Sequence, residues 1–197
     1  MTILYFGIYK SDFSRNGIYI AGLKQNGVSV LECRDDSRGI AKYWRLWKKH
    51  RVLRGKYDVL VVGYPGHLLV PFAKILSDRP VIADLLGSLS DAEFHSHSPS
   101  LFRRFKSALI DRLALRCADV ALLESEEQKK FFEERFGKSE KYRVVYTGAD
   151  DSVFHCSGLE ERKPFTALFR GSLTPESGIL HILKAAEILK GRGDIYF

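Results

Sequence analysis

Residues 165–197 read FTALFRGSLTPESGILHILKAAEILKGRGDIYF, and the order of elements in this stretch decides the prediction of the fold. Phe165–Phe169 is a short apolar run that ends before Gly171, as expected of a buried strand. Apolar residues then recur every three or four positions, which predicts a helix that ends at Gly191. A βαβ unit needs a second strand beside the first, and that strand has only begun at residues 194–197. We therefore expect one complete domain followed by the opening of a second.

The rest of the chain alternates apolar runs with helical patterns. The expected strands are 2–9, 28–33, 57–63, 80–85, 119–123 and 142–146. The expected helices begin at about residue 17 and cover 40–53, 68–76, 101–116 and 125–136. Strict alternation predicts an α/β fold, a Rossmann-like and mainly parallel sheet with helices on both faces. Residues 1–154 form this domain, 155–164 are a linker, and 165–197 begin an incomplete second Rossmann-like unit.

Ligands of such folds bind at the carboxyl ends of the strands, which points to the loops 10–16, 64–67, 86–100 and 147–151. The turn formed by Gly66 and His67 has two interpretations: it presents N–H groups and an imidazole to an anion, or it needs glycine only for its geometry. His95 and His97 match no standard set of metal ligands, so a mobile loop near a substrate is favoured over a metal site.

Composition and missing motifs exclude several classes of protein. The nucleotide-binding pattern G-x-G-x-x-G does not follow the first strand, and G-x-x-x-x-G-K-[ST] does not occur. Hydride-transfer dehydrogenases and P-loop NTPases are therefore disfavoured. Hydrophobic residues make up 45% of the chain, and no apolar run reaches the roughly 20 residues that span a bilayer. Three widely spaced cysteines indicate neither a disulfide framework nor a zinc site, so we expect a cytoplasmic protein.

The formal net charge of +7 is concentrated in one helix. Residues 37–57 hold eight lysines and arginines and no acidic residue. Ile40, Tyr43, Trp44 and Trp47 share one stripe of this helix, and most of the basic residues populate the opposite side. The stripe packs on the sheet, or its edge meets the anionic inner face of the cell membrane. The residues that would make this membrane contact are Lys42, Trp44, Arg45, Trp47, Lys48 and Lys49. Helix 101–116 would add Arg103, Arg104 and Lys106 to the same surface.

Four stretches together give the chain a family likeness. They are YDVLVVGYP at 57–65, ADVALLESEEQ at 118–128, VVYTGAD at 144–150 and FRGSLTPESG at 169–178. In this order they resemble the glycosyltransferases of GT-B fold, in the retaining group called family 4. The resemblance extends over essentially the whole chain, although each stretch alone is a modest signal.

The resemblance implies an N-terminal domain that binds the acceptor and a second domain that binds a nucleotide-sugar donor. The sugar would pass to a hydroxyl of a glycan or lipid-linked acceptor in polysaccharide or glycolipid assembly, with retained configuration and without a metal or other cofactor. Arg15 is the candidate for a phosphate contact, and Asp84 the candidate for orienting a hydroxyl. The residues expected to line the acceptor side of the cleft are Ser11, Arg15, Asn16, Gly66, His67, Asp84, His95 and His97.

The second domain departs from the family pattern. Gly171, Ser172 and Ser177 occupy its first turn, where the family commonly has Arg and Lys at the two serine positions. Hydroxyl groups do not supply the positive charge that a diphosphate needs. The paired glutamates of the family's donor domain are also missing. We therefore expect this polypeptide alone to be inactive, because it is a truncated chain or a natural half.

Two alternatives remain open. In the first, the chain is a non-catalytic subunit that docks on a membrane, binds the acceptor and completes the active site of a partner chain. In the second, the basic residues at 38–56 bind nucleic acid. No recognition motif supports the second alternative, and its basic residues lie away from the strand ends, so no nucleic-acid partner is expected.

Overall fold

The computed structural model describes residues 1–10, 14–94, 100–151, 153–155, 158, 164–171, 173 and 177–197. Ser11, His95, His97 and Ser172 of the predicted site lie outside these residues. The chain divides into two compact units, Met1–Asp150 and Asp151–Phe197, called unit 1 and unit 2 below.

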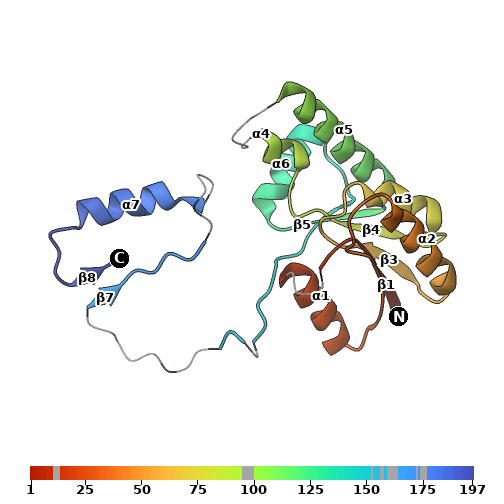
Figure 1. The fold of residues 1–197 in the computed structure, drawn as a ribbon, viewed down its shortest axis with the longest axis horizontal. Coiled ribbons are helices and arrows are strands. Elements are labelled where there is room, and N and C mark those ends of the chain that lie inside the picture. Colours follow the sequence, from red (N-terminus) through yellow and green to blue (C-terminus); the bar gives the residue numbers. More distant parts are fainter. Residues whose placement is uncertain are drawn as a thin grey trace. The chain divides into compact units, whose positions relative to one another are not determined.

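Unit 1 is built on a parallel sheet of six strands in the order β2-β1-β3-β4-β5-β6 (Figure 1). The strands are β1 (Thr2–Gly7), β2 (Ser29–Arg34), β3 (Val59–Val62), β4 (Val81–Asp84), β5 (Val120–Leu123) and β6 (Tyr142–Val144). In the registers, Leu4 of β1 pairs with Leu60 of β3, and Leu60 pairs with Val81 of β4. These residues are apolar and completely buried. The predicted α/β, Rossmann-like parallel sheet is confirmed.

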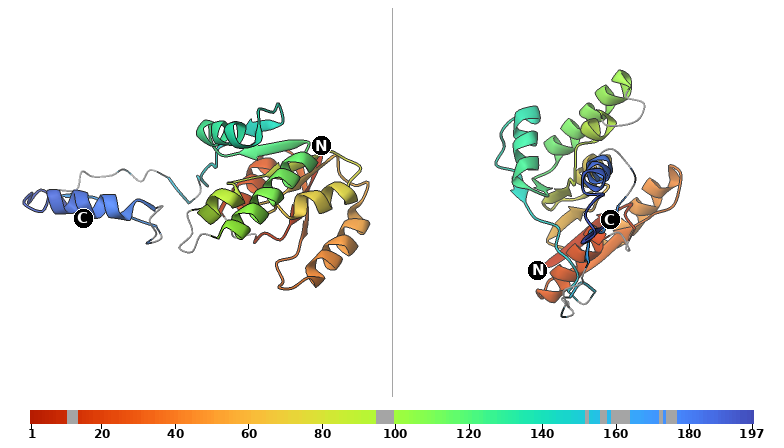
Figure 2. Two further views of the ribbon diagram at one scale, coloured as in Figure 1. Left: turned by 90° about the horizontal axis from the view of Figure 1, so that it is seen from above. Right: turned by 90° about the vertical axis from the view of Figure 1, so that its left-hand side faces the viewer.

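Six helices cover the two faces of the sheet unequally (Figure 2). They are α1 (Ser14–Gln25), α2 (Ala41–Leu53), α3 (Leu69–Leu76), α4 (Leu89–Phe94), α5 (Leu101–Cys117) and α6 (Glu126–Phe136). Leu46 of α2, Ala73 of α3, Ala114 of α5 and Phe132 of α6 belong to the larger core cluster. Ile20 of α1 belongs to the smaller cluster, on the opposite face. Four helices thus share one face, and α1 lies on the other.

Two helices differ from the sequence prediction at the edge where ligands are expected. Helix α1 begins at Ser14, so Arg15 and Asn16 lie in its first turn and not in a loop. Helix α4 occupies part of the stretch that we predicted to be an irregular polar loop. Its beginning is stabilised by Ser88, whose Oγ accepts from the N–H of Asp91 at 3.2 Å. Ser88 and Asp91 have the spacing of a capping box, a signal that the sequence contains.

The prediction that the stripe of Ile40, Tyr43, Trp44 and Trp47 packs helix α2 on the sheet is only partly correct. Leu46 and His50 are the buried residues of α2, whereas Ile40 is 85% exposed and Trp44 is 57% exposed. His50 tolerates burial because its Nε2 lies 2.7 Å from the hydroxyl of Tyr57. Tyr43 of the stripe does pack against the larger core cluster, so the stripe is buried at Tyr43 and exposed at Trp44.

Helix α5 also shows a rotation that periodicity did not reveal. Asp111 and Ala114 are its buried residues. Its exposed face instead carries five large apolar side chains, those of Leu101, Phe102, Phe105, Leu109 and Leu113. Asp111 accepts hydrogen bonds from the Ser88 hydroxyl at 2.8 Å and from the N–H groups of Leu89 and Ser90 at 3.1 and 3.0 Å. A carboxylate that binds the first N–H groups of α4 is favourable inside the protein, because it neutralises unpaired helix donors.

Unit 2 contains one small βαβ element. Strand β7 (Phe165–Thr166) pairs in parallel with β8 (Ile195–Tyr196), and helix α7 (Ile179–Ile188) lies between them in the sequence. Its strands are shorter than the predicted run at 165–169. No residue of α7 is buried, although the helix is rich in Ile and Leu.

The turn after β3 requires glycine at residue 66. A Cβ placed on Gly66 would lie 2.6 Å from the carbonyl oxygen of Gly63 and 2.5 Å from the side chain of Val62. A Cβ placed on Gly22, in helix α1, meets nothing within 4 Å. We therefore expect Gly66→Ala to lower the free energy of unfolding by about 1–3 kcal/mol. We expect Gly22→Ala to raise it by about 0.5–1 kcal/mol, because alanine restricts the unfolded chain.

Urea denaturation of the two variants measures both effects on the same scale. Equal stability of the Gly66→Ala variant and the parent protein would show that the turn relaxes without cost.

Candidate functional site

The residues at the carboxyl edge of the sheet are joined by a buried ion pair between Arg15 and Asp84. Arg15 lies in the first turn of α1, and Asp84 is the last residue of β4. Arg15 Nε donates to both carboxylate oxygens at 2.9 and 3.0 Å, and Nη2 donates to Oδ1 at 2.7 Å. The two side chains are 2% and 0% exposed. This bidentate pair fastens α1 to the centre of the sheet.

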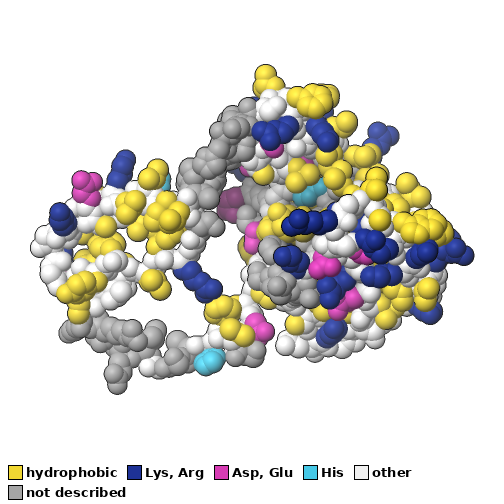
Figure 3. Space-filling view, viewed as in Figure 1, with side chains coloured by type: hydrophobic (Ala, Val, Ile, Leu, Met, Phe, Trp, Pro, Cys, Tyr) yellow, Lys and Arg dark blue, Asp and Glu magenta, His cyan; other side chains and the backbone are white. Residues whose placement is uncertain are grey.

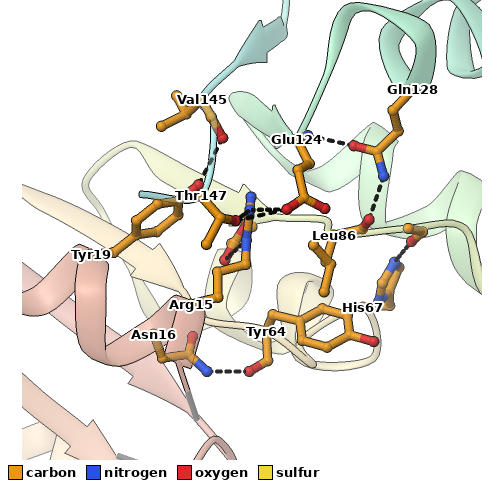
Figure 4. A network of polar contacts seen from close by, with 12 residues as sticks. Arg15, Asn16, Tyr19, Tyr64, His67, Leu86, Glu124, Gln128, Val145 and Thr147 are labelled. Carbon is orange, nitrogen blue, oxygen red and sulfur yellow. Dashed lines mark hydrogen bonds and ion pairs between the residues drawn. The ribbon is translucent and has the colours of Figure 1, made fainter. Parts of the chain in front are cut away.

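Figure 4 shows that the same guanidinium reaches the ends of β5 and β6. Arg15 Nη1 donates to the hydroxyl of Thr147, and that hydroxyl donates to Glu124 Oε1 at 2.9 Å. Glu124 directly follows β5, and its side chain is 43% exposed. Gln128 accepts from the N–H of Glu124 and donates to the carbonyl of Leu86, which closes the network.

Burial and pairing act in opposite directions on the charges of Arg15 and Asp84. Burial raises the pKa of Asp84, and the hydrogen bonds and positive charge of Arg15 limit that rise. For Arg15, burial alone would lower the pKa, but the hydrogen bonds and charge of Asp84 outweigh it and raise the pKa. We assign an ionised pair, because a guanidinium that donates three hydrogen bonds to one carboxylate stabilises the carboxylate form.

The sheet has a topological switch point between β1 and β3. The helix that follows β1 covers one face and the helix that follows β3 covers the other, so the chain diverges at the carboxyl ends of these two strands. Ligands of open α/β sheets bind in the crevice at this position. Asn16 crosses it: its Nδ2 donates to the carbonyl of Tyr64 at 2.6 Å, and its Oδ1 accepts from Tyr5 at 3.0 Å.

His67 stands on the α3 side of the switch point and is almost completely buried. Its Nε2 lies 2.9 Å from the carbonyl oxygen of Gly87, which requires a proton on that nitrogen. Among the described residues, Nδ1 has no hydrogen-bond partner. Burial lowers the pKa of His67, although Asp111 at 3.9 Å opposes that effect. The imidazole is therefore neutral near pH 7.

The structure brings together five of the residues predicted for the cleft, namely Arg15, Asn16, Gly66, His67 and Asp84. All five are buried, so they position the strand-end loops. Their predicted contacts with a phosphate or a hydroxyl stay predictions. Glu124 and Thr147 are part of the same network, but they are not among the residues that we predicted for the cleft. The signal was available, because Glu124 directly follows a predicted strand and Thr147 begins a loop that we had placed at the ligand edge.

The turn predicted for the donor phosphate lies in unit 2. Gly171 is exposed and Ser177 is partly buried. Their predicted contact with a diphosphate stays a prediction.

The basic residues of α2 do not form a separate charged side, contrary to the prediction. Trp44 and Trp47 stack with ring centroids 4.5 Å apart, and Lys48 lies 5.3 Å over the ring of Trp44. Arg45 is paired with Asp35 at 2.7 Å, and Lys49 donates to the carbonyl of Arg34 at 2.6 Å. Lys42 lies 5.8 Å over the ring of Tyr43. Cations and aromatic rings are therefore interleaved on the outer side of this helix.

Two structural features are absent from the part of the chain that the structure describes. No three His, Cys, Asp or Glu side chains there are grouped as a metal site would require. No helix within the same residues has the length and apolar character to cross a membrane.

A double-mutant cycle tests the role of the buried pair. Arg15→Ala leaves Asp84 buried without its partner, so we expect it to cost about 3–5 kcal/mol of stability. Arg15→Ala combined with Asp84→Ala removes both charges, and we expect it to cost clearly less than the sum of the single changes. The measurement is chemical denaturation of the four proteins. Additive losses would show that the two side chains act independently.

The neutral state of His67 predicts a dependence of stability on pH. Its pKa is lower in the folded than in the unfolded chain, so the unfolded chain binds the proton more readily. Stability is therefore lost as the pH falls below about 6.5, by up to about 1.4 kcal/mol per pH unit for this residue. We expect His67→Gln to flatten the profile of unfolding free energy between about pH 7 and 5. The control is His181→Gln, which changes an exposed histidine of α7. A profile that is as steep in His67→Gln as in the control would contradict the assignment.

No protein-family model matches the sequence, and no curated protein matches it. Among solved structures, the chain is similar to crystal structures of Anabaena Alr3699/HepE in complex with UDP, with UDP and glucose, and with UDP-glucose. The sequence identities are 17%, 16% and 17%, and the TM-scores are 0.48, 0.48 and 0.46. Each match covers 94% of this chain and 50%, 51% and 50% of the other, so this chain spans about half the length of those proteins. At these values the likeness says nothing about the activity of this chain.

Proposed function

We propose that unit 1 is the acceptor side of a glycosyltransferase that moves a sugar from a nucleotide-sugar to a hydroxyl group. The observation that carries the proposal is the arrangement at the switch point. Arg15 and Asn16 on α1 and Gly66 and His67 before α3 bracket the carboxyl ends of β1 and β3. This is the position where parallel α/β sheets bind their ligands. The four family-like stretches of the sequence support the choice of reaction.

Glu124 is the residue that we propose to contact the acceptor. Its Oε1 accepts from Thr147, and the side chain is 43% exposed at the edge of the buried network. A carboxylate that is fixed on one side and accessible to solvent on the other is suited to accept a hydrogen bond from a sugar hydroxyl. In this proposal, Arg15 holds Glu124 and Thr147 in place and does not itself meet the substrate.

The donor side belongs, in this proposal, to a second Rossmann-like domain that begins at residue 165 and includes Gly171, Ser172 and Ser177. Residues 1–154 are then the acceptor domain and 155–164 the linker. The reaction retains the anomeric configuration, needs no metal, and uses a glycan or lipid-linked acceptor. Positive charge for the leaving diphosphate has to come from the donor side, because the guanidinium of Arg15 is already bound by Asp84.

The alternative is a non-catalytic subunit that binds the acceptor and docks on a membrane. The pairing of Arg15 with Asp84 favours neither the enzyme nor the subunit. In both hypotheses, the positive charge that neutralises the donor diphosphate comes from outside unit 1. An activity assay on mixtures of this chain with a donor-binding partner distinguishes the two hypotheses. A subunit gives activity only when both polypeptides are present.

Two glutamate substitutions test the proposed role of Glu124. We expect Glu124→Gln, in the protein with its donor side present, to reduce kcat/KM by about tenfold or more. The control Glu127→Gln changes an exposed glutamate of α6 and should leave kcat/KM unchanged. Release of UDP from UDP-sugars in the presence of oligosaccharide acceptors gives the rates, and NMR of the product gives the anomeric configuration. Full activity of Glu124→Gln would remove this residue from the acceptor site, and an inverted product would contradict the retaining reaction.

A further inference from the structure

The outward face of helix α5 carries an unusually large apolar surface. Leu101, Phe102, Phe105, Leu109 and Leu113 are 82%, 76%, 70%, 58% and 47% exposed. They recur at spacings of three and four residues, so they form one continuous stripe along the helix. Single exposed apolar residues are common on proteins, but a contiguous patch of this kind marks an interaction surface.

The charges on the same face all have one sign. Lys106, Arg112 and Arg116 are exposed, and the helical period places them among the apolar residues of the stripe. The single acidic residue of α5 is Asp111, which points to the interior and binds α4. The outer face of α5, defined by these five apolar and three basic residues, therefore contains no carboxylate. Figure 3 shows hydrophobic and basic side chains close together over this part of unit 1.

The buried side of the helix explains why the apolar residues cannot turn inward. Asp111 accepts three hydrogen bonds from the beginning of α4, and breaking them would leave a buried carboxylate without donors. Ala114 provides the close contact with the core. The rotation of α5 about its axis is fixed by these contacts, and the stripe is held in the outward position.

We propose that the outer face of α5 docks unit 1 on the surface of an anionic lipid bilayer. The aromatic and leucine side chains enter the boundary between headgroups and acyl chains, and Lys106, Arg112 and Arg116 pair with lipid phosphates. Charge complementarity selects this occupant. A second copy of the chain would bring the same cations against one another, and a neutral apolar partner would bury them without counter-charges.

Helix α2 extends the surface on the same side of the sheet. Both helices belong to the layer that covers the larger core, and α3 lies between them, with Phe72 of α3 against Tyr43 of α2. Trp44 is exposed, with Lys48 over its ring, and Arg51 lies 4.9 Å over the ring of Trp47. Of the membrane contacts predicted on α2, Trp44, Lys48 and Lys49 are exposed, and Lys49 also donates to the carbonyl of Arg34. The inference does not depend on the reaction proposed above, because the apolar stripe takes no part in the strand-end network.

Co-sedimentation with lipid vesicles tests the proposal. The probes are vesicles of phosphatidylcholine alone and vesicles of phosphatidylcholine mixed with phosphatidylglycerol. We expect binding to the mixed vesicles that weakens as salt is added, and little binding to phosphatidylcholine alone. Leu109→Gln combined with Leu113→Gln should reduce the partition coefficient by about tenfold or more. Lys106→Gln should reduce it by roughly fivefold.

Matched controls separate the surface of α5 from general stickiness. Leu180→Gln combined with Leu183→Gln changes two leucines of α7 that are 60% and 58% exposed, and should leave the partition coefficient unchanged. Lys24→Gln changes a lysine of α1, on the other face of the sheet, and controls for Lys106→Gln. Circular dichroism of each variant verifies that it is folded.

Three results would overturn the proposal. The first is equal binding to both kinds of vesicle, which would mean that the cations take no part. The second is equal loss in the α5 and α7 leucine variants. The third is a dimer in size-exclusion chromatography that the α5 substitutions dissociate, which would make a second copy of the chain the occupant.

Discussion

The buried pair between Arg15 and Asp84 is the interaction on which the carboxyl edge of the sheet depends. One guanidinium joins α1, β4 and the residues that follow β5 and β6, so a single side chain fixes segments that are up to 132 positions apart in the sequence. Charges taken out of water are costly unless each hydrogen bond is made. Here the carboxylate of Asp84 receives three hydrogen bonds from Arg15. The pair fixes how α1 and the strand-end loops are placed relative to one another. The half-exposed Glu124 is held at the edge of this network through Thr147.

A second buried carboxylate, that of Asp111, lies 3.9 Å from Nε2 of His67 and has an effect of the same kind on helices α4 and α5. Asp111 binds the first N–H groups of α4 and thereby sets the rotation of α5. The polar interaction is inside and the apolar stripe is outside, the reverse of an ordinary amphipathic surface helix. In both places, a buried aspartate side chain and its hydrogen-bond donors decide which residues reach the surface.

The sequence predicted the fold well, because hydrophobic period and turn residues carry that information. The parallel strands around Leu4, Leu60 and Val81 follow from continuous apolar runs bounded by turn residues. The orientation of α5 did not follow, because the period of a helix shows which residues share a face but not which face is buried. That choice depended on Asp111 and its partners on α4, a contact between segments that pattern analysis treats separately.

The candidate site was predicted only in part, because its contacts also join segments that are distant in the sequence. The rule that ligands bind at strand ends selected Asp84 and His67, and both lie there. The rule did not reveal that Arg15 would be in a helix and paired with Asp84, because a lone Arg and a lone Asp give no sign of their distance in the fold. Glu124 and Thr147 also follow predicted strands, but the sequence did not show that one guanidinium contacts both of them.

The direction of α5 has a consequence for how an acceptor would be found. The helix follows the loop after β4, so it starts near the carboxyl edge of the sheet and runs towards the opposite edge, a length of about 25 Å. Leu101, Phe102 and Phe105 therefore lie at the end of the helix that is nearer to the strand-end site. If the outer face of α5 docks on a bilayer as proposed above, the strand-end site is held at a constant height above the lipid headgroups. The search for the lipid-linked acceptor proposed above would then take place in two dimensions, and the length of the acceptor's head would decide whether it reaches Glu124.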